Sequence, residues 1–154
     1  MSAYERLPLR LMTSTALASA LSGATMTWRS RLDTGHWAAA TNAVSHWIWG
    51  NRALRRNSVT TRETGVGAGV HTASALLWAV LFEALRLRHK TPTVATAVAD
   101  AAIVTAVAAT VDLKLVPHRL TPGFQDRLSN RSLLWTYAAF AAGLALGSAL
   151  VARR

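Results

Sequence analysis

Three ionisable side chains lie in or beside stretches that otherwise carry no charge, and they are the first candidates for chemistry. Asp100 is the only Asp, Glu, Lys or Arg within residues 91–111. A carboxylate in so apolar a segment must be protonated, paired or in contact with water, as in proton and cation pathways. Glu83 and His71, on the preceding apolar segment, extend this candidate proton or ion pathway. The alternatives are a packing role for Asp100, and for Glu83 a snorkelling position or an ion pair with Arg86.

Two histidines flank a basic connector and form a second candidate site. Residues 51–63 join the segments that carry His46 and His71, so we expect both imidazoles just inside the same membrane face. Neutral imidazoles ligate haem iron or metal ions, and arginines bind propionates, phosphates or anionic lipid headgroups. The alternative is that each histidine is an ordinary hydrogen-bonded group. The arginines of this candidate headgroup or cofactor site are Arg52, Arg55, Arg56 and Arg62.

Motifs typical of enzymes are missing from the sequence. It contains no HExxH pair, no nucleophile–His–Asp spacing and no pair of carboxylates on one helix face. The chain also has no cysteine, which excludes disulfides and thiolate metal sites. We therefore expect no enzymatic activity, no catalytic residue and no resident metal or cofactor, with haem or a metal bound through His46 and His71 as the alternative. The remaining histidines, His36, His89 and His118, lie beside charges and are expected to be solvated.

The elements that must position these residues follow from the distribution of charge. Four stretches contain no Asp, Glu, Lys or Arg: residues 11–28, 34–51, 64–82 and 132–152. Each uncompensated charge in the hydrocarbon of a bilayer costs roughly 2.5–3.5 kcal/mol, so this spacing is typical of membrane spans. It predicts an all-α protein, a polytopic transmembrane helical bundle forming one membrane domain over residues 1–154. The expected spans are residues 8–28, 64–87, 92–115 and 132–152.

Residues 34–50 are the ambiguous element of this fold. On a helix, Trp37, Val44 and Trp47 fall on one face, while Asn42 and His46 lean toward the other. Seventeen residues with three tryptophans favour an amphipathic or re-entrant helix at the membrane interface. The prediction is therefore four spans plus this helix, with a fifth span as the alternative.

Small residues recur at helical spacing in two of the expected spans. Ala139, Gly143 and Gly147 follow one another at intervals of four, as do Ser19 and Gly23. Such spacing lets two helices approach closely in a membrane. These residues predict helix–helix packing, within the chain or with another subunit.

The net charge of +10 does not indicate a nucleic-acid-binding protein. The basic residues lie at the ends of the apolar runs, without stacking aromatics between them, which is the pattern of contacts with anionic lipid headgroups. With four spans, ten of the seventeen Arg and Lys residues fall in the two long connectors. By the positive-inside rule, those connectors are expected to face the cytoplasm of a bacterial inner membrane.

A resemblance covers residues 40–90. The run NAVSHWIWG, the glycine-rich segment with His71 and the run LWAVLFEAL resemble small bacterial integral membrane proteins of unknown function. The resemblance implies a multi-pass membrane location and no particular activity. Chain length and tryptophan content are also similar to those of the tryptophan-rich sensory family of five-helix membrane proteins, whose motifs do not align with this chain.

Three functions are compatible with these residues. The first is helix–helix association, as an accessory subunit of a membrane complex or as a homo-oligomer. The second is a small-solute or proton-coupled transporter or channel that uses Asp100. The third is an electron-transfer subunit that binds haem or a metal through His46 and His71. The expected partners are anionic lipids and other membrane subunits or a second copy of the chain.

Overall fold

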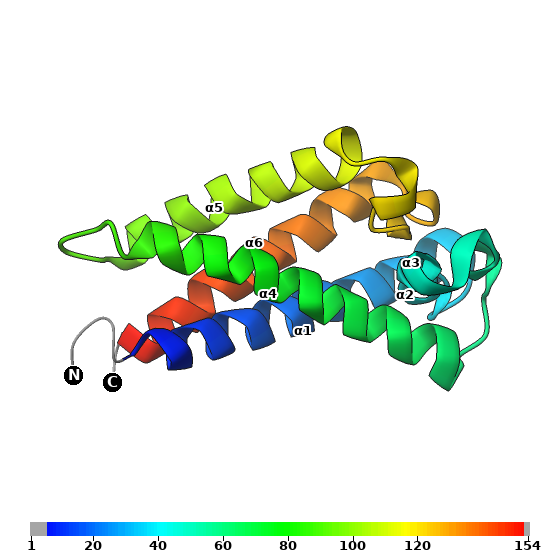
Figure 1. The fold of residues 1–154 in the computed structure, drawn as a ribbon, viewed down its shortest axis with the longest axis horizontal. Helices are drawn as coiled ribbons and strands as arrows, with labels where there is room; N and C mark the ends of the chain where they lie inside the picture. The colour runs from blue at the N-terminus through cyan, green and yellow to red at the C-terminus, as the bar shows by residue number, and fades with distance from the viewer. Residues whose placement is uncertain (1–5, 153–154) are drawn as a thin grey trace.

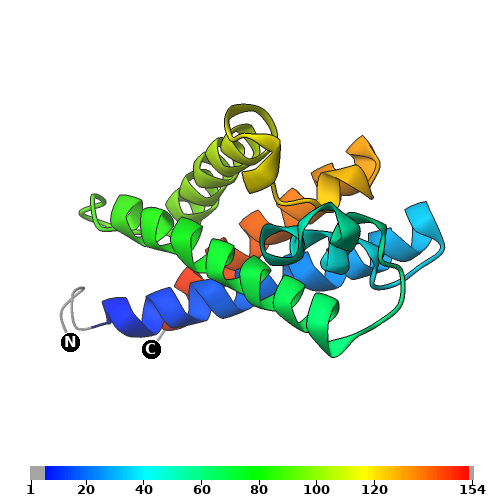
Figure 2. The ribbon, with the colours of Figure 1, turned by 45° about the vertical axis from the view of Figure 1, so that its right-hand side comes forward.

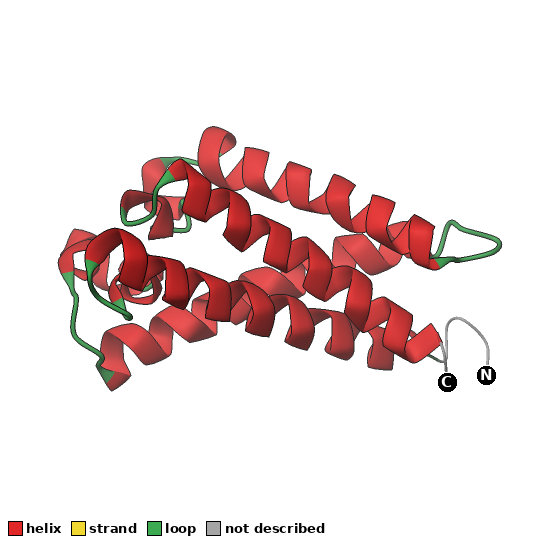
Figure 3. Ribbon diagram, turned by 180° about the vertical axis from the view of Figure 1, so that it is seen from behind, coloured by secondary structure: helices red, strands yellow, loops and turns green. Residues whose placement is uncertain are grey.

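Four long helices form the body of the protein, and successive long helices alternate in direction (Figure 1). They are α1 (Leu7–Thr34), α4 (Val66–Arg86), α5 (Val94–Thr110) and α6 (Asn130–Ala152). The computed structural model describes residues 6–152, of which 82% are helical, and no strand occurs among them (Figure 3). The predicted all-α class is therefore confirmed.

The bundle has two unlike ends. At the terminal end, α1 begins, α6 ends, and residues 87–93 join α4 to α5. At the connector end, residues 35–60 and 116–129 link the long helices and contain most of the short helical elements (Figure 1). These short elements are α2 (Ala39–Val44), α3 (His46–Trp49), η1 (Gly50–Arg55), η2 (Thr61–Gly65), η3 (Val111–Leu115), η4 (His118–Leu120) and η5 (Phe124–Asp126).

Three helical stretches are long and apolar enough to cross a membrane. They are Thr61–Arg86, Val94–Leu115 and Asn130–Val151. Large apolar side chains such as Leu77 and Ile103 are more than half exposed on the outside of the bundle, whereas polar groups such as Ser14 are buried inside it. This arrangement suits a hydrocarbon surrounding better than water. Lipid solvates apolar side chains, whereas polar groups must find hydrogen-bond partners inside the protein.

The segment predicted as one helix over residues 34–50 is divided, so that prediction is wrong. α1 continues to Thr34 and ends at Gly35, whose φ of 79° is the left-handed conformation that glycine adopts without strain. The chain then forms α2 and α3 beside α1 and α4 at the connector end (Figure 2). With six and four residues, these helices are too short to form a fifth span.

The polar face of this segment points inward. Asn42 and His46 are fully buried, whereas Trp37 and Trp47 are 54% and 38% exposed. The amide nitrogen of Asn42 donates to the carbonyl oxygens of Arg56 and Ser58 at 3.0 and 2.9 Å. A buried amide requires such partners, so the polar residues hold the connector in place while the tryptophans form the outer surface.

α1 and α6 are in unusually close contact. A β-carbon built on Gly143 would lie 2.4 Å from the α-carbon of Ala18, and one on Gly147 would lie 2.4 Å from that of Ser14. Gly23 and Ser19 face α4 instead, where the Ser19 and Thr72 hydroxyl groups lie 2.8 Å apart. Four of the small residues identified in the sequence, Ser19, Gly23, Gly143 and Gly147, thus lie at contacts within the protein.

Replacing Gly143 by alanine tests the contact between α1 and α6. The added methyl group meets backbone atoms that cannot rotate away, so we expect a loss of about 1–3 kcal/mol in the free energy of unfolding. Gly69→Ala is the matched control, because nothing lies within 4 Å of its β-carbon position. Thermal unfolding of the detergent-solubilised variants measures the difference, and equal stabilities would contradict the close contact.

Candidate functional site

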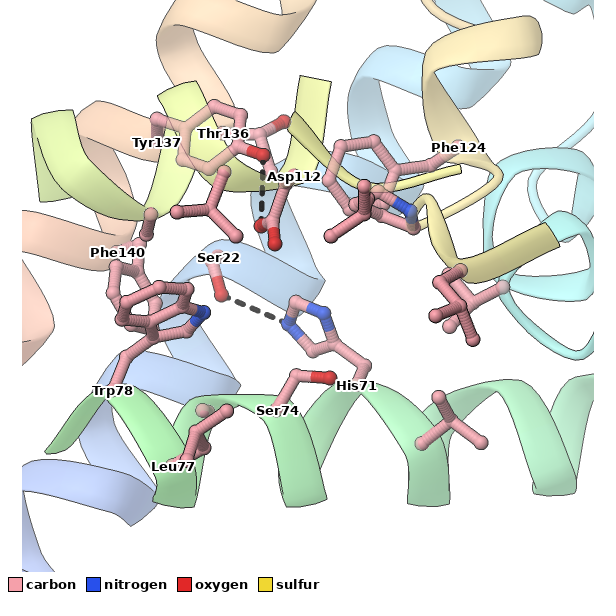
Figure 4. A pocket seen from close by; sticks show the side chains of 18 of the residues that line it. Ser22, His71, Ser74, Leu77, Trp78, Asp112, Phe124, Thr136, Tyr137 and Phe140 are labelled. Atoms are coloured by element: carbon pink, nitrogen blue, oxygen red, sulfur yellow. Dashed lines mark hydrogen bonds between the residues drawn. The ribbon is translucent and has the colours of Figure 1, made fainter. Parts of the chain in front are cut away.

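A cavity of about 210 Å³ lies between α4, α5 and α6 in the half of the bundle nearer the connectors. Its walls are mainly apolar and aromatic, with Trp78 and Phe140 toward one side and Phe124 toward the other (Figure 4). Trp47, on α3, also contributes to the lining. A concave, largely apolar space with a few polar groups is the usual form of a small-molecule site.

Two polar pairs face this cavity. The hydroxyl group of Tyr137 donates to Oδ2 of Asp112 at 3.1 Å. Across the cavity, Nε2 of His71 lies 2.9 Å from Oγ of Ser22 (Figure 4). The polar groups are therefore concentrated in the middle of the cavity, with aromatic side chains on both sides of them.

Asp112 reaches the cavity because of the way α5 ends. The buried face of α5 includes Ala101 and Ala108, and Asp112 lies one helical turn beyond Ala108. From residue 111 to 115 the helix widens to a π-turn, in which the N–H of Val116 donates to the carbonyl of Val111 at 3.1 Å. Short π-turns within α-helices are frequent at functional sites.

The two histidines of the predicted cofactor site take separate partners. His71 lies in the cavity wall. Nδ1 of His46 lies 2.9 Å from the carbonyl oxygen of Ala43, and its Nε2 lies 3.3 Å from that of His118. Because both of its nitrogens face carbonyl oxygens, His46 has no free nitrogen for an iron or other metal ion. No cluster of three or more potential metal ligands occurs among residues 6–152.

The arginines predicted to lie beside these histidines are on the outer surface of the connector end. Arg52, Arg55 and Arg56 are exposed. Arg62 is also exposed and lies over the ring of Trp49, with its guanidinium carbon 4.2 Å from the ring centre. His46, by contrast, is buried, so these exposed arginines do not form one site with it.

Glu83 belongs to a buried ion pair at the terminal end. Its carboxylate lies 2.5 Å from a guanidinium nitrogen of Arg10 and accepts a hydrogen bond of 2.7 Å from Ser14. Glu83 is 1% exposed and Arg10 is 9% exposed. The predicted pairing of Glu83 with Arg86 on the same helix is wrong: α1 supplies the partner, and Arg86 is used elsewhere.

Asp100 forms the second buried pair. Its carboxylate lies 3.4 Å from Arg86 and 2.9 Å from Nε2 of His89. Arg86 also donates to the hydroxyl groups of Thr96 on α5 and Ser148 on α6, at 2.7 and 3.4 Å. These contacts connect α4, α5 and α6. His89, which we expected to be fully solvated, keeps one-third of its side chain exposed while it bonds Asp100.

The predicted proton or ion pathway is thus divided between two places. Asp100 and Glu83 lie among the ion pairs of the terminal end, whereas His71 lies in the cavity. Twelve residues separate His71 from Glu83 along α4, which corresponds to about 18 Å at 1.5 Å per residue. Asp112 and Tyr137 are not among the site residues that the sequence predicts. The available signal was the position of Asp112 one turn beyond the apolar stripe of its helix.

Comparisons with known proteins leave the function to be argued from this geometry. No protein-family model matches the chain, and neither a curated protein nor a solved structure is detectably similar to it.

The pair between Arg10 and Glu83 can be tested by single and double substitution. Arg10→Met leaves a buried carboxylate without its cation, and we expect it to lower the free energy of unfolding by about 3–5 kcal/mol. Arg10→Met combined with Glu83→Gln removes both charges and should recover most of that loss. Thermal unfolding in detergent compares the two variants, and a single variant at least as stable as the double one would contradict the pairing.

Proposed function

We propose that this chain is a four-span integral membrane protein that binds a small, largely apolar molecule in the cavity between α4, α5 and α6. The observation that carries this proposal is the aromatic cavity of about 210 Å³ within the apolar part of the bundle. An apolar cavity of about 150 Å³ is large enough to hold benzene. The cavity therefore suits a molecule with one or two rings, smaller than the ligands of typical drug-sized pockets of about 300–1,000 Å³.

α1 is the fourth span in this proposal. Its uncharged stretch, residues 11–28, contains many Ser and Thr residues, which lower its hydropathy. It packs antiparallel along α6, which is apolar enough to cross a membrane, so the two helices occupy the same depth. Arg10 is neutralised by Glu83 at one end of α1, and Arg29 lies at the opposite end.

The distribution of basic residues supports an orientation in a bacterial inner membrane. The connector end contains ten of the seventeen Arg and Lys residues and faces the cytoplasm by the positive-inside rule. Its exposed arginines then contact anionic lipid headgroups, and the exposed Trp28 and Trp37 lie near the same boundary. Those arginines are Arg52, Arg55, Arg56 and Arg62.

The binding function can be tested with 1-naphthalenemethanol as a neutral two-ring probe. We expect one saturable site per protein in detergent or nanodiscs, above the probe's partition into protein-free particles. Ser74→Leu places a larger side chain into the cavity and should weaken binding about tenfold or more. Ala73→Leu, at an exposed neighbouring position, is the matched control and should bind normally. Equal binding by wild type and Ser74→Leu in equilibrium dialysis would contradict the proposal.

Association with a second copy or with another membrane subunit is a second candidate function. α1 packs directly against Gly143 and Gly147 within the protein, so these glycines are not accessible to a partner. The observation that favours association is the outer face of α5, where small residues are exposed at helical spacing. These residues are Ala95, Ala99, Ala102 and Ala106.

Ala99→Phe tests this association. A large ring on the outer face of α5 prevents close helix approach, so the cross-linked dimer fraction in native membranes should fall. Leu77→Phe, at an exposed position on α4, is the control and should leave that fraction unchanged. Equal dimer fractions in the two variants would argue against association through α5.

A further inference from the structure

α4, α5 and η3 each carry one carboxylate, and the three have unequal partners. Glu83 is paired with Arg10, and Asp100 is paired with Arg86 and His89. Asp112 has only the phenol of Tyr137, and among residues 6–152 no Arg, Lys or His nitrogen lies within 4.0 Å of its carboxylate. The protein itself therefore neutralises two of these charges and leaves the third at the wall of a cavity.

A carboxylate in a low-dielectric environment is stabilised by a cation that hydrogen-bonds to it. Tyr137 donates a hydrogen bond to Oδ2 of Asp112. Among the described residues, none donates a hydrogen bond to Oδ1. The carboxyl group points into the cavity, toward the wall that carries His71 and Ser74 (Figure 4). A cation that pairs with the Asp112 carboxylate can thus be part of a molecule bound in this cavity.

The aromatic walls fit the same kind of ligand. Trp78, Phe140 and Phe124 surround the polar centre of the cavity (Figure 4). The faces of aromatic rings are electronegative and attract organic cations, and this attraction grows when water is excluded. The same rings pack against the apolar body of a ligand. An anion, by contrast, would meet the Asp112 carboxylate without a neighbouring arginine or lysine.

We propose that the cavity selects a small organic amine with an aromatic or alicyclic body, whose ammonium group donates a hydrogen bond to Asp112. This inference rests on the proposed binding function of the cavity. The apolar body lies against the tryptophan and phenylalanine side chains, and Ser74 is a further polar residue of the cavity lining.

Three naphthalene probes of similar size test this selectivity. They are 1-naphthylmethylamine, 1-naphthalenemethanol and 1-naphthoic acid, which are respectively cationic, neutral and anionic at pH 7. Because a charge-assisted hydrogen bond is about twice as strong as a neutral one, we expect the amine to bind about tenfold more tightly than the alcohol. The acid should bind more weakly than both. Equilibrium dialysis against the wild-type protein, with protein-free nanodiscs as the blank, measures all three.

Asp112→Asn removes the charge and keeps an oxygen that accepts from Tyr137. We expect this variant to lose about tenfold in affinity for the amine, which is a larger loss than for the alcohol. Asp126→Asn is the matched control, because Asp126 is a carboxylate outside the cavity that contacts His118. It should not change the preference for the amine.

The outcomes separate this inference from the proposed function. If the alcohol binds saturably but the amine has no advantage, or if Asp112→Asn weakens both probes equally, the amine assignment is overturned and the binding function stands. If neither probe binds saturably to the wild type, the proposed function fails as well.

Discussion

The need to pair charges inside an apolar bundle determines much of this structure. Arg10 with Glu83 joins α1 to α4, and Arg86 with Asp100 joins α4 to α5. A buried ion pair adds little net stability over an apolar contact, yet an unpaired charge in its place costs several kcal/mol. The pairs therefore act mainly by excluding arrangements in which these helices are shifted or separated, and they hold the terminal end of the bundle together.

Close backbone packing between α1 and α6 is a second constraint, besides the pairing of buried charges. The cavity lies away from both the ion pairs and this helix contact. Gly143 and Gly147 bring α6 against α1, so these two helices form a tightly packed pair. Toward the connector end, α4, α5 and α6 surround the cavity, whose wall carries Asp112. The protein thus combines a closed, charge-paired end with a half that has room for a ligand.

The sequence predicts the long helices well because a bilayer limits where charges can lie, and that limit acts locally along the chain. The sequence predicts the ion-pair partners of charged side chains poorly, because those partners depend on which helices become neighbours in the fold. Glu83 has a suitable cation three residues away, yet Arg10, far away in sequence, binds it. The length of residues 34–50 and their three tryptophans predict an interfacial helix. In the structure Asn42 faces inward, since the neighbouring connector supplies its hydrogen bonds.

A small molecule that occupies the cavity should shield a cysteine in the cavity wall from alkylation. The chain has no cysteine, so Ser74→Cys and Ala73→Cys each introduce a single reporter thiol, one in the cavity wall and one outside it. The rate of alkylation by N-ethylmaleimide is measured in native membranes with and without saturating 1-naphthylmethylamine. We expect the amine to slow alkylation at position 74 and to leave the rate at position 73 unchanged. Unchanged rates at both positions, or equal slowing at both, would contradict binding in the cavity.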